Sequence, residues 1–185
     1  MSREAYHHGD LRTALVEEAV ATIEEGGLDA LSVRSLARRA GVSHAAPAHH
    51  FGDRHGLVDA VIGEGFLRLR DALASALVAG GSPVEVGVAY SRFALDNPRL
   101  FALMFGPVQE PESATTRAAK DAAAAVLRES VRKDAPPAPD ERRRAVAAWA
   151  TTHGLAVLWV SGQIAHEPDA SLEALVRAVL LDARR

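Results

Sequence analysis

Two groups of histidines, one of them with a nearby aspartate, are candidate metal ligands in this sequence, because imidazole and carboxylate groups together bind divalent metal ions. The groups are His7, His8 and Asp10, and His49, His50 and His55. Adjacent residues of a helix point about 100° apart, so neighbouring histidines are poorly placed to share one ion. No His-Glu-x-x-His spacing occurs either. We therefore expect no metal site and no cofactor.

Covalent catalysis has equally little support in the sequence. The chain has no cysteine, which excludes disulfide scaffolds, thiolate zinc sites, iron–sulfur clusters and cysteine nucleophiles. It also lacks a Gly-x-Ser-x-Gly elbow, a phosphate-binding glycine loop and a dinucleotide fingerprint. We expect no catalytic residues and a protein that is not an enzyme.

Basic side chains are concentrated between residues 30 and 58, although the 185-residue chain carries a net charge of −3. Four arginines and a single acid give this stretch a local charge of +3; they are Arg34, Arg38, Arg39, Arg54 and Asp53. Four histidines add latent positive charge. Such a patch favours phosphate groups as partners.

Capped helices should position these groups. Apolar spacing and capping residues predict helices over 10–25, 32–40, 44–50 and 53–79, with Asp10, Ser32, Ser43 and Asp53 as N-caps. Gly41 ends the second helix, so residues 32–51 describe a helix-turn-helix unit, which can place a short helix in the major groove. The same pattern also occurs in ordinary helical corners.

The remainder of the chain is also predicted to be helical. Helices are expected over 84–96, 97–104, 113–133, 140–164 and 172–181, with a proline-rich linker at 135–139. No segment alternates as a strand does, and 48% of the residues are hydrophobic. The fold class is therefore all-α with a sizeable core. The longest apolar run, 155–160, is too short to span a bilayer, so we expect a cytoplasmic protein with no membrane partner.

The run from Leu31 to Leu57 resembles the DNA-binding domain of TetR-family transcriptional regulators. It contains Leu-Ala-x-x-Ala-Gly-Val-Ser followed by His-Phe-x-Asp, and the resemblance covers about seventy residues. Trp149, His153 and Gly154 further resemble a branch whose ligand domain carries a Trp-x-x-x-His-Gly motif. The resemblance implies a DNA-binding domain at 1–70 and a ligand-binding and dimerisation domain at 71–185.

The resemblance also implies which residues approach DNA. They are Ser32, Val33 and Arg34, then Ser43, His44, Ala45, Ala46, Ala48, His49 and His50, and finally Arg54 at the position of a phosphate-binding lysine. Ala48 stands where the family commonly has a tyrosine, and His49 where this branch often has a stronger donor. We therefore expect weak or shape-dominated readout, strengthened below about pH 6.5 by protonation of the histidines.

The second half offers a candidate ligand site and a dimer seam. Candidate pocket residues are Tyr90, Phe93, Met104, Phe105, Trp149 and His153. His153 has two interpretations: a core histidine satisfied by a neighbour, or the polar group that orients a ligand. The helix over 140–164 is apolar on two sides, so one side is expected to pack on a second subunit together with the last helix.

The sequence as a whole favours a homodimeric repressor that binds a palindromic double-stranded DNA operator and is released by a small-molecule effector. The alternative is a helical ligand-binding or interaction module with weakened DNA binding, which the alanine-rich third helix keeps open.

Overall fold

The computed structural model describes residues 8–107, 111–134, 140–164 and 170–183. Within these ranges the regular structure is helical and contains no strand, which confirms the all-α prediction. The elements are α1 (His8–Gly26), η1 (Leu28–Ala30), α2 (Val33–Arg39), α3 (Ala45–Phe51), α4 (Arg54–Val78), α5 (Pro83–Asp96), α6 (Pro98–Met104), α7 (Ala114–Asp134), α8 (Glu141–Val160) and α9 (Leu172–Asp182). Across the described part of the chain, no helix combines the length and apolar character needed to cross a membrane.

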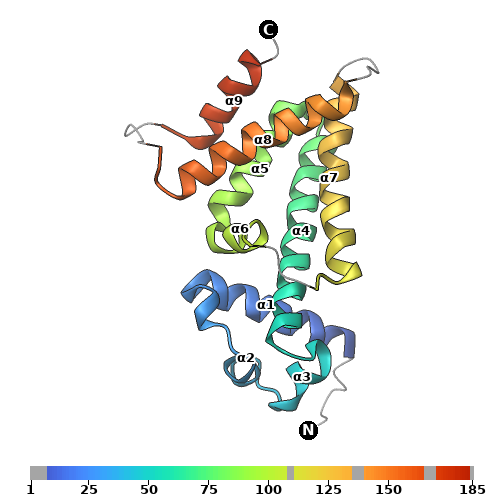
Figure 1. Ribbon diagram of the computed structural model, residues 1–185, viewed down its shortest axis with the longest axis vertical. Coiled ribbons are helices and arrows are strands. Elements are labelled where there is room, and N and C mark those ends of the chain that lie inside the picture. Colours follow the sequence, from blue (N-terminus) through green and yellow to red (C-terminus); the bar gives the residue numbers. More distant parts are fainter. Residues whose placement is uncertain (1–7, 108–110, 135–139, 165–169, 184–185) are drawn as a thin grey trace.

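The molecule is elongated, with α1, α2 and α3 gathered at one end and α8 and α9 near the other (Figure 1). Helix α4 connects the two ends: its 25 residues extend over about 37 Å at 1.5 Å per residue. It packs most extensively on α7. Buried side chains from both ends belong to one continuous hydrophobic cluster, in which Leu57, Leu69 and Leu73 are contributed by α4. Helix α4 is therefore one physical connection between the two halves, and α6, which packs on α1, is another.

Helix α5 lies at the centre of the C-terminal half, packed against α4, α8 and α9. Its residues Val86 and Tyr90 are fully buried, as is Val176 of α9. Most of the predicted boundaries of these helices agree with the structure within two residues. The linker at 135–139 and the start of the chain, including His7, lie outside the described residues.

Two predicted caps in the N-terminal half are wrong. The chain is already helical at His8, so Asp10 lies within α1 and not at the position before its first residue. Helix α3 has His44 as its N-cap, without a side-chain hydrogen bond, and Ser43 contributes only its backbone carbonyl, which accepts from the Ala46 amide at 3.1 Å. This short helix begins without the side-chain cap that a serine hydroxyl would supply.

Helix α8 begins where predicted, with Asp140 at its N-cap position, but it lacks the expected side-chain cap bond and ends earlier than predicted. The side chain of Asp140 makes no cap bond, because it pairs instead with Arg143 at 3.3 Å and Arg144 at 3.5 Å. The helix ends at Val160 rather than at residue 164. Gly162 takes a left-handed φ of 70°, and the Gln163 amide then donates to the Leu158 carbonyl at 2.8 Å. This arrangement closes a helix C-terminus.

Candidate nucleic-acid interface and small-molecule pocket

Ser32 fixes the start of α2 through a reciprocal cap. Its hydroxyl accepts from the Ser35 amide at 3.0 Å, and the Ser35 hydroxyl accepts from the Ser32 amide at 3.3 Å. The two hydroxyls are also 2.8 Å apart. The predicted cap at Ser32 is thus confirmed. The reciprocal cap satisfies backbone donors at the first turn of α2 and so fixes where this helix begins.

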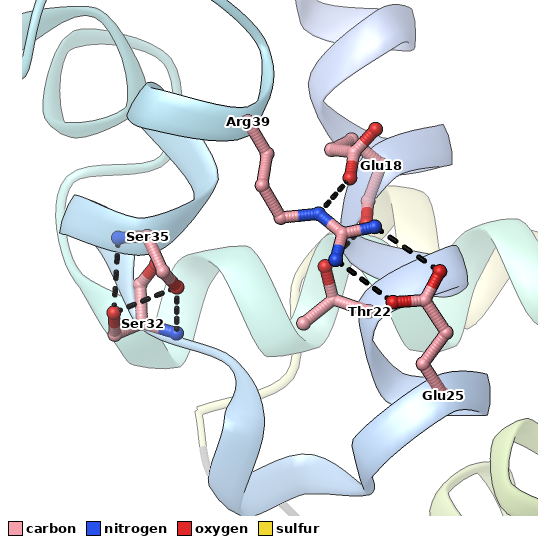
Figure 2. Close-up of polar contacts among 6 residues, drawn as sticks. All are labelled: Glu18, Thr22, Glu25, Ser32, Ser35 and Arg39. Carbon is pink, nitrogen blue, oxygen red and sulfur yellow. Dashed lines mark hydrogen bonds and ion pairs between the residues drawn. The ribbon is translucent and has the colours of Figure 1, made fainter.

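Arg39 fastens the end of α2 to α1 (Figure 2). Its guanidinium pairs with Glu18 through Nε and with Glu25 through Nη1 at 2.8 Å. A second Nη2 bond to Glu25 at 3.2 Å makes this contact bidentate. The arginine lowers the pKa of Glu25 below its ordinary value. The positive charge of Arg39 is therefore neutralised by Glu18 and Glu25, and it adds little to the electrostatic potential at the surface of α2.

Helix α3 is presented at the end of the molecule (Figure 1) with its small side chains exposed. Ser43, His44, Ala45, Ala48 and His49 are exposed, whereas Ala46 and His50 are half-buried. Pro47 is buried and occupies the first turn, where the backbone nitrogen has no helical acceptor in any case. The side of α3 away from Pro47 is therefore free to enter a groove.

Glycine makes the turn between α2 and α3 possible. Gly41 has a φ of 67°, a left-handed conformation that other residues adopt at a cost. The predicted stop of α2 at this glycine is confirmed, since α2 ends at Arg39 with Ala40 as its C-cap. The turn sets α2 and α3 against each other, as a helix-turn-helix requires.

The arginines of this region have different surroundings. Arg34 and Arg38 are exposed, and in the described part of the chain neither side chain makes a hydrogen bond or ion pair. Arg54 at the start of α4 donates to the Leu28 and Leu31 carbonyls at 2.9 and 3.3 Å. Val33 is half-buried beside Arg34. Arg34 and Arg38 are thus the cations most available to phosphate, and sequence reasoning had not singled out Arg38 as a site residue.

A cavity of about 470 Å³ lies between α4, α6, α7 and α8. Its apolar lining residues are Phe66, Leu69, Tyr90, Met104, Phe105, Ala123, Ala124, Leu127, Ala145, Val146 and Trp149. Its charged lining residues are Lys120, Asp121, Arg128 and Arg142. The volume and the apolar walls are those of a small-molecule site. Four of the predicted pocket residues, Tyr90, Met104, Phe105 and Trp149, therefore lie together around one cavity.

The other two predicted pocket residues lie behind this wall. Phe93 is buried in the core and His153 does not line the cavity. The Nδ1 atom of His153 shares a hydrogen bond of 2.8 Å with the Tyr90 hydroxyl, and its ring lies 4.6 Å from that of Phe105. Burial lowers the pKa of His153 and raises that of Tyr90. His153 is thus placed to support the wall of the cavity from behind.

The charged lining residues and Phe66 were not predicted from the sequence. Lys120, Asp121 and Arg128 are on α7, which the sequence showed only as an alanine-rich helix. All three side chains line the cavity. Which residues of α7 do so depends on how this helix packs on α4 and α8, and the sequence does not specify that packing. No metal site adds to this chemistry in the described part of the chain, where no three histidine or acidic side chains converge.

Helices α8 and α9 leave an apolar surface uncovered. Val157 and Leu158 of α8 are each 39% exposed, and Leu181 of α9 is 47% exposed. Alanines extend this surface, which we call the α8/α9 face; they are Ala150, Ala174 and Ala178. Ala174, Ala178 and Leu181 repeat at intervals of four and three residues, so they form one stripe along α9.

Both halves of the chain match known protein families. Residues 15–61 match a family described as bacterial regulatory proteins, tetR family. Residues 84–179 match a family described as the tetracyclin repressor-like C-terminal domain. These matches cover the helix-turn-helix and most of the cavity-forming half.

Individual relatives agree with these matches. A protein of unknown function from Rhodococcus sp. RHA1 is 37% identical, with 96% of this chain and 95% of that chain covered and a TM-score of 0.78. A TetR family transcriptional regulator, PfmR from Thermus thermophilus, shares the fold at 24% identity, with 89% and 93% covered and a TM-score of 0.60. The HTH-type transcriptional regulator BetI from Cronobacter sakazakii is 36% identical over 66 residues, which are 36% of this chain and only 33% of that protein.

Proposed function

Since the chain belongs to the TetR family of bacterial regulatory proteins, we propose that it is a homodimeric repressor that binds a palindromic operator and is released by a small-molecule effector. The DNA-binding unit is residues 1–70 and the ligand-binding and dimerisation unit is residues 71–185. This division falls inside α4, so the two units share one helix. We further assign the chain to the branch with the Trp-x-x-x-His-Gly motif, whose residues here are Trp149, His153 and Gly154.

The exposed α3 is the observation that carries this proposal. Its outward residues are available to base edges, while Ser32 and Arg34 at the start of α2 are available to the backbone phosphates. Amide groups at a helix N-terminus also favour phosphate. Arg54 supports this surface by holding the segment between α1 and α2 through the Leu28 and Leu31 carbonyls.

A dimer supplies the second half of the operator contact. One short helix reads only a few base pairs, and a two-fold protein doubles that contact at half-sites about 34 Å apart. The α8/α9 face has the exposed apolar side chains that a helical subunit interface needs. Helices α8 and α9 of one subunit would pack against the same two helices of the other and form a four-helix bundle at the subunit interface.

The effector would act through two connections between the halves. Phe66 and Leu69 line the cavity and lie on α4, whose first turn adjoins α3. The second connection is at the start of α6, where the Leu100 amide donates to the Glu24 carboxylate of α1 at 2.7 Å. A ligand that favours one position of α4 and α6 shifts the spacing of the two reading helices, within the limit set by its differential affinity for the two states.

One observation favours a second candidate, an interaction module with weakened DNA binding. Ala45, Ala46 and Ala48 of α3 have no side-chain donors, and a good bidentate base contact gives about 1–3 kcal/mol of discrimination. Specificity must then come from backbone contacts and DNA shape.

Selection of genomic fragments from the source organism, followed by DNase I footprinting at low salt, separates the two candidates. The repressor proposal expects protection of a palindrome, weakened by Arg34→Ala and Arg38→Ala. Absence of any protected site at low salt contradicts it and supports the interaction module. As a cytoplasmic regulator, the protein would meet such sites directly.

A further inference from the structure

We infer that the cavity between α4, α7 and α8 takes an apolar monocarboxylate, whose carboxylate lies between Arg128 and Arg142 and whose hydrocarbon part lies against Phe66. This inference rests on the proposal that the cavity is the effector site. It adds the chemical class of the ligand, which the resemblance to known regulators leaves open.

The apolar part of the cavity requires an apolar ligand body. Phe66, Leu69 and Met104 form buried walls. At the rim, Val146 is 51% exposed and Trp149 is 40% exposed. A hydrocarbon ligand would cover both and remove their apolar surface from water.

Among the basic side chains that line the cavity, Lys120 has an ion-pair partner, whereas Arg128 and Arg142 have none among the described residues. Lys120 forms an ion pair with Glu112, and its Nζ lies 5.5 Å from the centre of the Phe66 ring. Arg128 and Arg142 line the same cavity, and neither side chain has a hydrogen bond or ion pair to any residue that the structure describes. Two arginines without a counter-ion at the edge of an apolar cavity favour an anion.

Asp121 determines the end of the cavity at which the anion belongs. Arg128 is seven positions further along α7 than Asp121, a rise of about 10 Å along a helix. Arg142 is the second residue of α8, so it lies where α7 and α8 approach each other. A carboxylate near Asp121 would be repelled, whereas at the Arg128 and Arg142 end it meets two planar guanidinium groups suited to its geometry. The hydrocarbon then extends toward α6.

Isothermal titration calorimetry of the unmodified chain tests the assignment with three probes of equal length: octanoate, octan-1-ol and octylamine. We expect octanoate to bind about tenfold more tightly than octan-1-ol, a difference of about 1.4 kcal/mol, and octylamine to bind most weakly. The double variant Arg128→Gln with Arg142→Gln should bind octanoate and octan-1-ol equally. Each single variant, Arg128→Gln and Arg142→Gln, should reduce the preference for octanoate. Arg143→Gln is the control for these single variants: it also removes one positive charge, next to Arg142, but Arg143 pairs with Asp140 and does not line the cavity, so the preference for octanoate should remain.

Equal binding of octanoate and octan-1-ol by the unmodified chain would overturn the inference, as would the absence of octanoate binding. An equal loss of preference in Arg143→Gln would also overturn it, because the effect would then be one of overall charge. Operator release is measured separately. Octanoate that binds with the expected preference but leaves the operator complex intact supports the ligand class and contradicts the proposed release mechanism.

Discussion

The hydroxyl of Tyr90 and the Nδ1 of His153 share a hydrogen bond of 2.8 Å that joins α5 to α8 directly behind the cavity wall. Tyr90 is fully buried, so this bond satisfies a polar atom that water cannot reach. The aromatic rings of Phe101 and Phe105 lie 5.5 and 4.6 Å from the His153 ring and hold it in place. The geometry favours His153 as a supporting core residue over a group that contacts ligand.

Tyr90→Phe should lower the free energy of unfolding by about 1–2 kcal/mol, because it removes one hydrogen bond and leaves a ring nitrogen without its partner. Urea unfolding followed by circular dichroism measures this change. His153→Phe and the double variant complete a mutant cycle. A coupling energy near zero would show that the two side chains do not stabilise each other.

Acidification should destabilise the fold through His153. Burial lowers the pKa of His153 in the folded chain from the ordinary value of 6.5. As the pH falls below that value, the unfolded chain binds a proton that the folded chain resists, so stability falls with pH. The melting temperature of the parent should therefore decrease between pH 7.5 and 5.5 by more than that of His153→Asn. Parallel melting curves for the two proteins over this interval would disprove the effect.

Replacing Arg39 and replacing Arg38 should have different effects on the melting temperature and on operator binding, although the two residues are adjacent. Arg39→Ala removes two ion pairs to α1 and should lower the melting temperature by about 1–3 °C, with weaker operator binding as α2 loosens. Arg38→Ala should leave the melting temperature unchanged. It should reduce the salt dependence of operator binding by about 0.9 in the slope of log K against log salt if it contacts one phosphate. The reverse assignment of these two effects would refute the roles given to the two arginines.

Leu158→Glu should convert the protein to a monomer, since it places a charge in the α8/α9 face. Leu158 is 39% exposed in the single chain, so the monomer should keep its fold. Leu95→Glu is the control, because Leu95 has a similar exposure of 36% but lies on α5 outside this face. Light scattering gives the masses. If the Leu158→Glu protein remained a dimer, the subunit interface would not be the α8/α9 face.

Features that depend on neighbouring residues in the chain could be predicted from the sequence. Ser32, Gly41 and Asp53 define the boundaries of α2 and α4 through local bonds and backbone conformation. The side chains of Ser43 and Asp140 make no cap bonds although their residue types are suitable, and only Asp140 lies at the N-cap position. Asp140 fails because nearby arginines compete for its carboxylate.

Features that depend on packing between distant elements could not be predicted in this way. The attachment of Arg39 to α1 joins residues 14 and 21 positions apart. That Arg128 and Arg142 line one cavity depends on how α7 packs against α8. Four of the six candidate pocket residues nevertheless line the cavity, because large apolar side chains cluster wherever a helical core opens.

The pairing of two chains on one operator can be measured by sedimentation equilibrium of the protein on its selected duplex, at about 50 and 200 mM salt. We expect chains bound in pairs on each palindromic duplex, with affinity that falls steeply between the two salt concentrations, and no such complex for Leu158→Glu. A single chain per duplex, or an affinity unchanged by salt, would contradict this expectation.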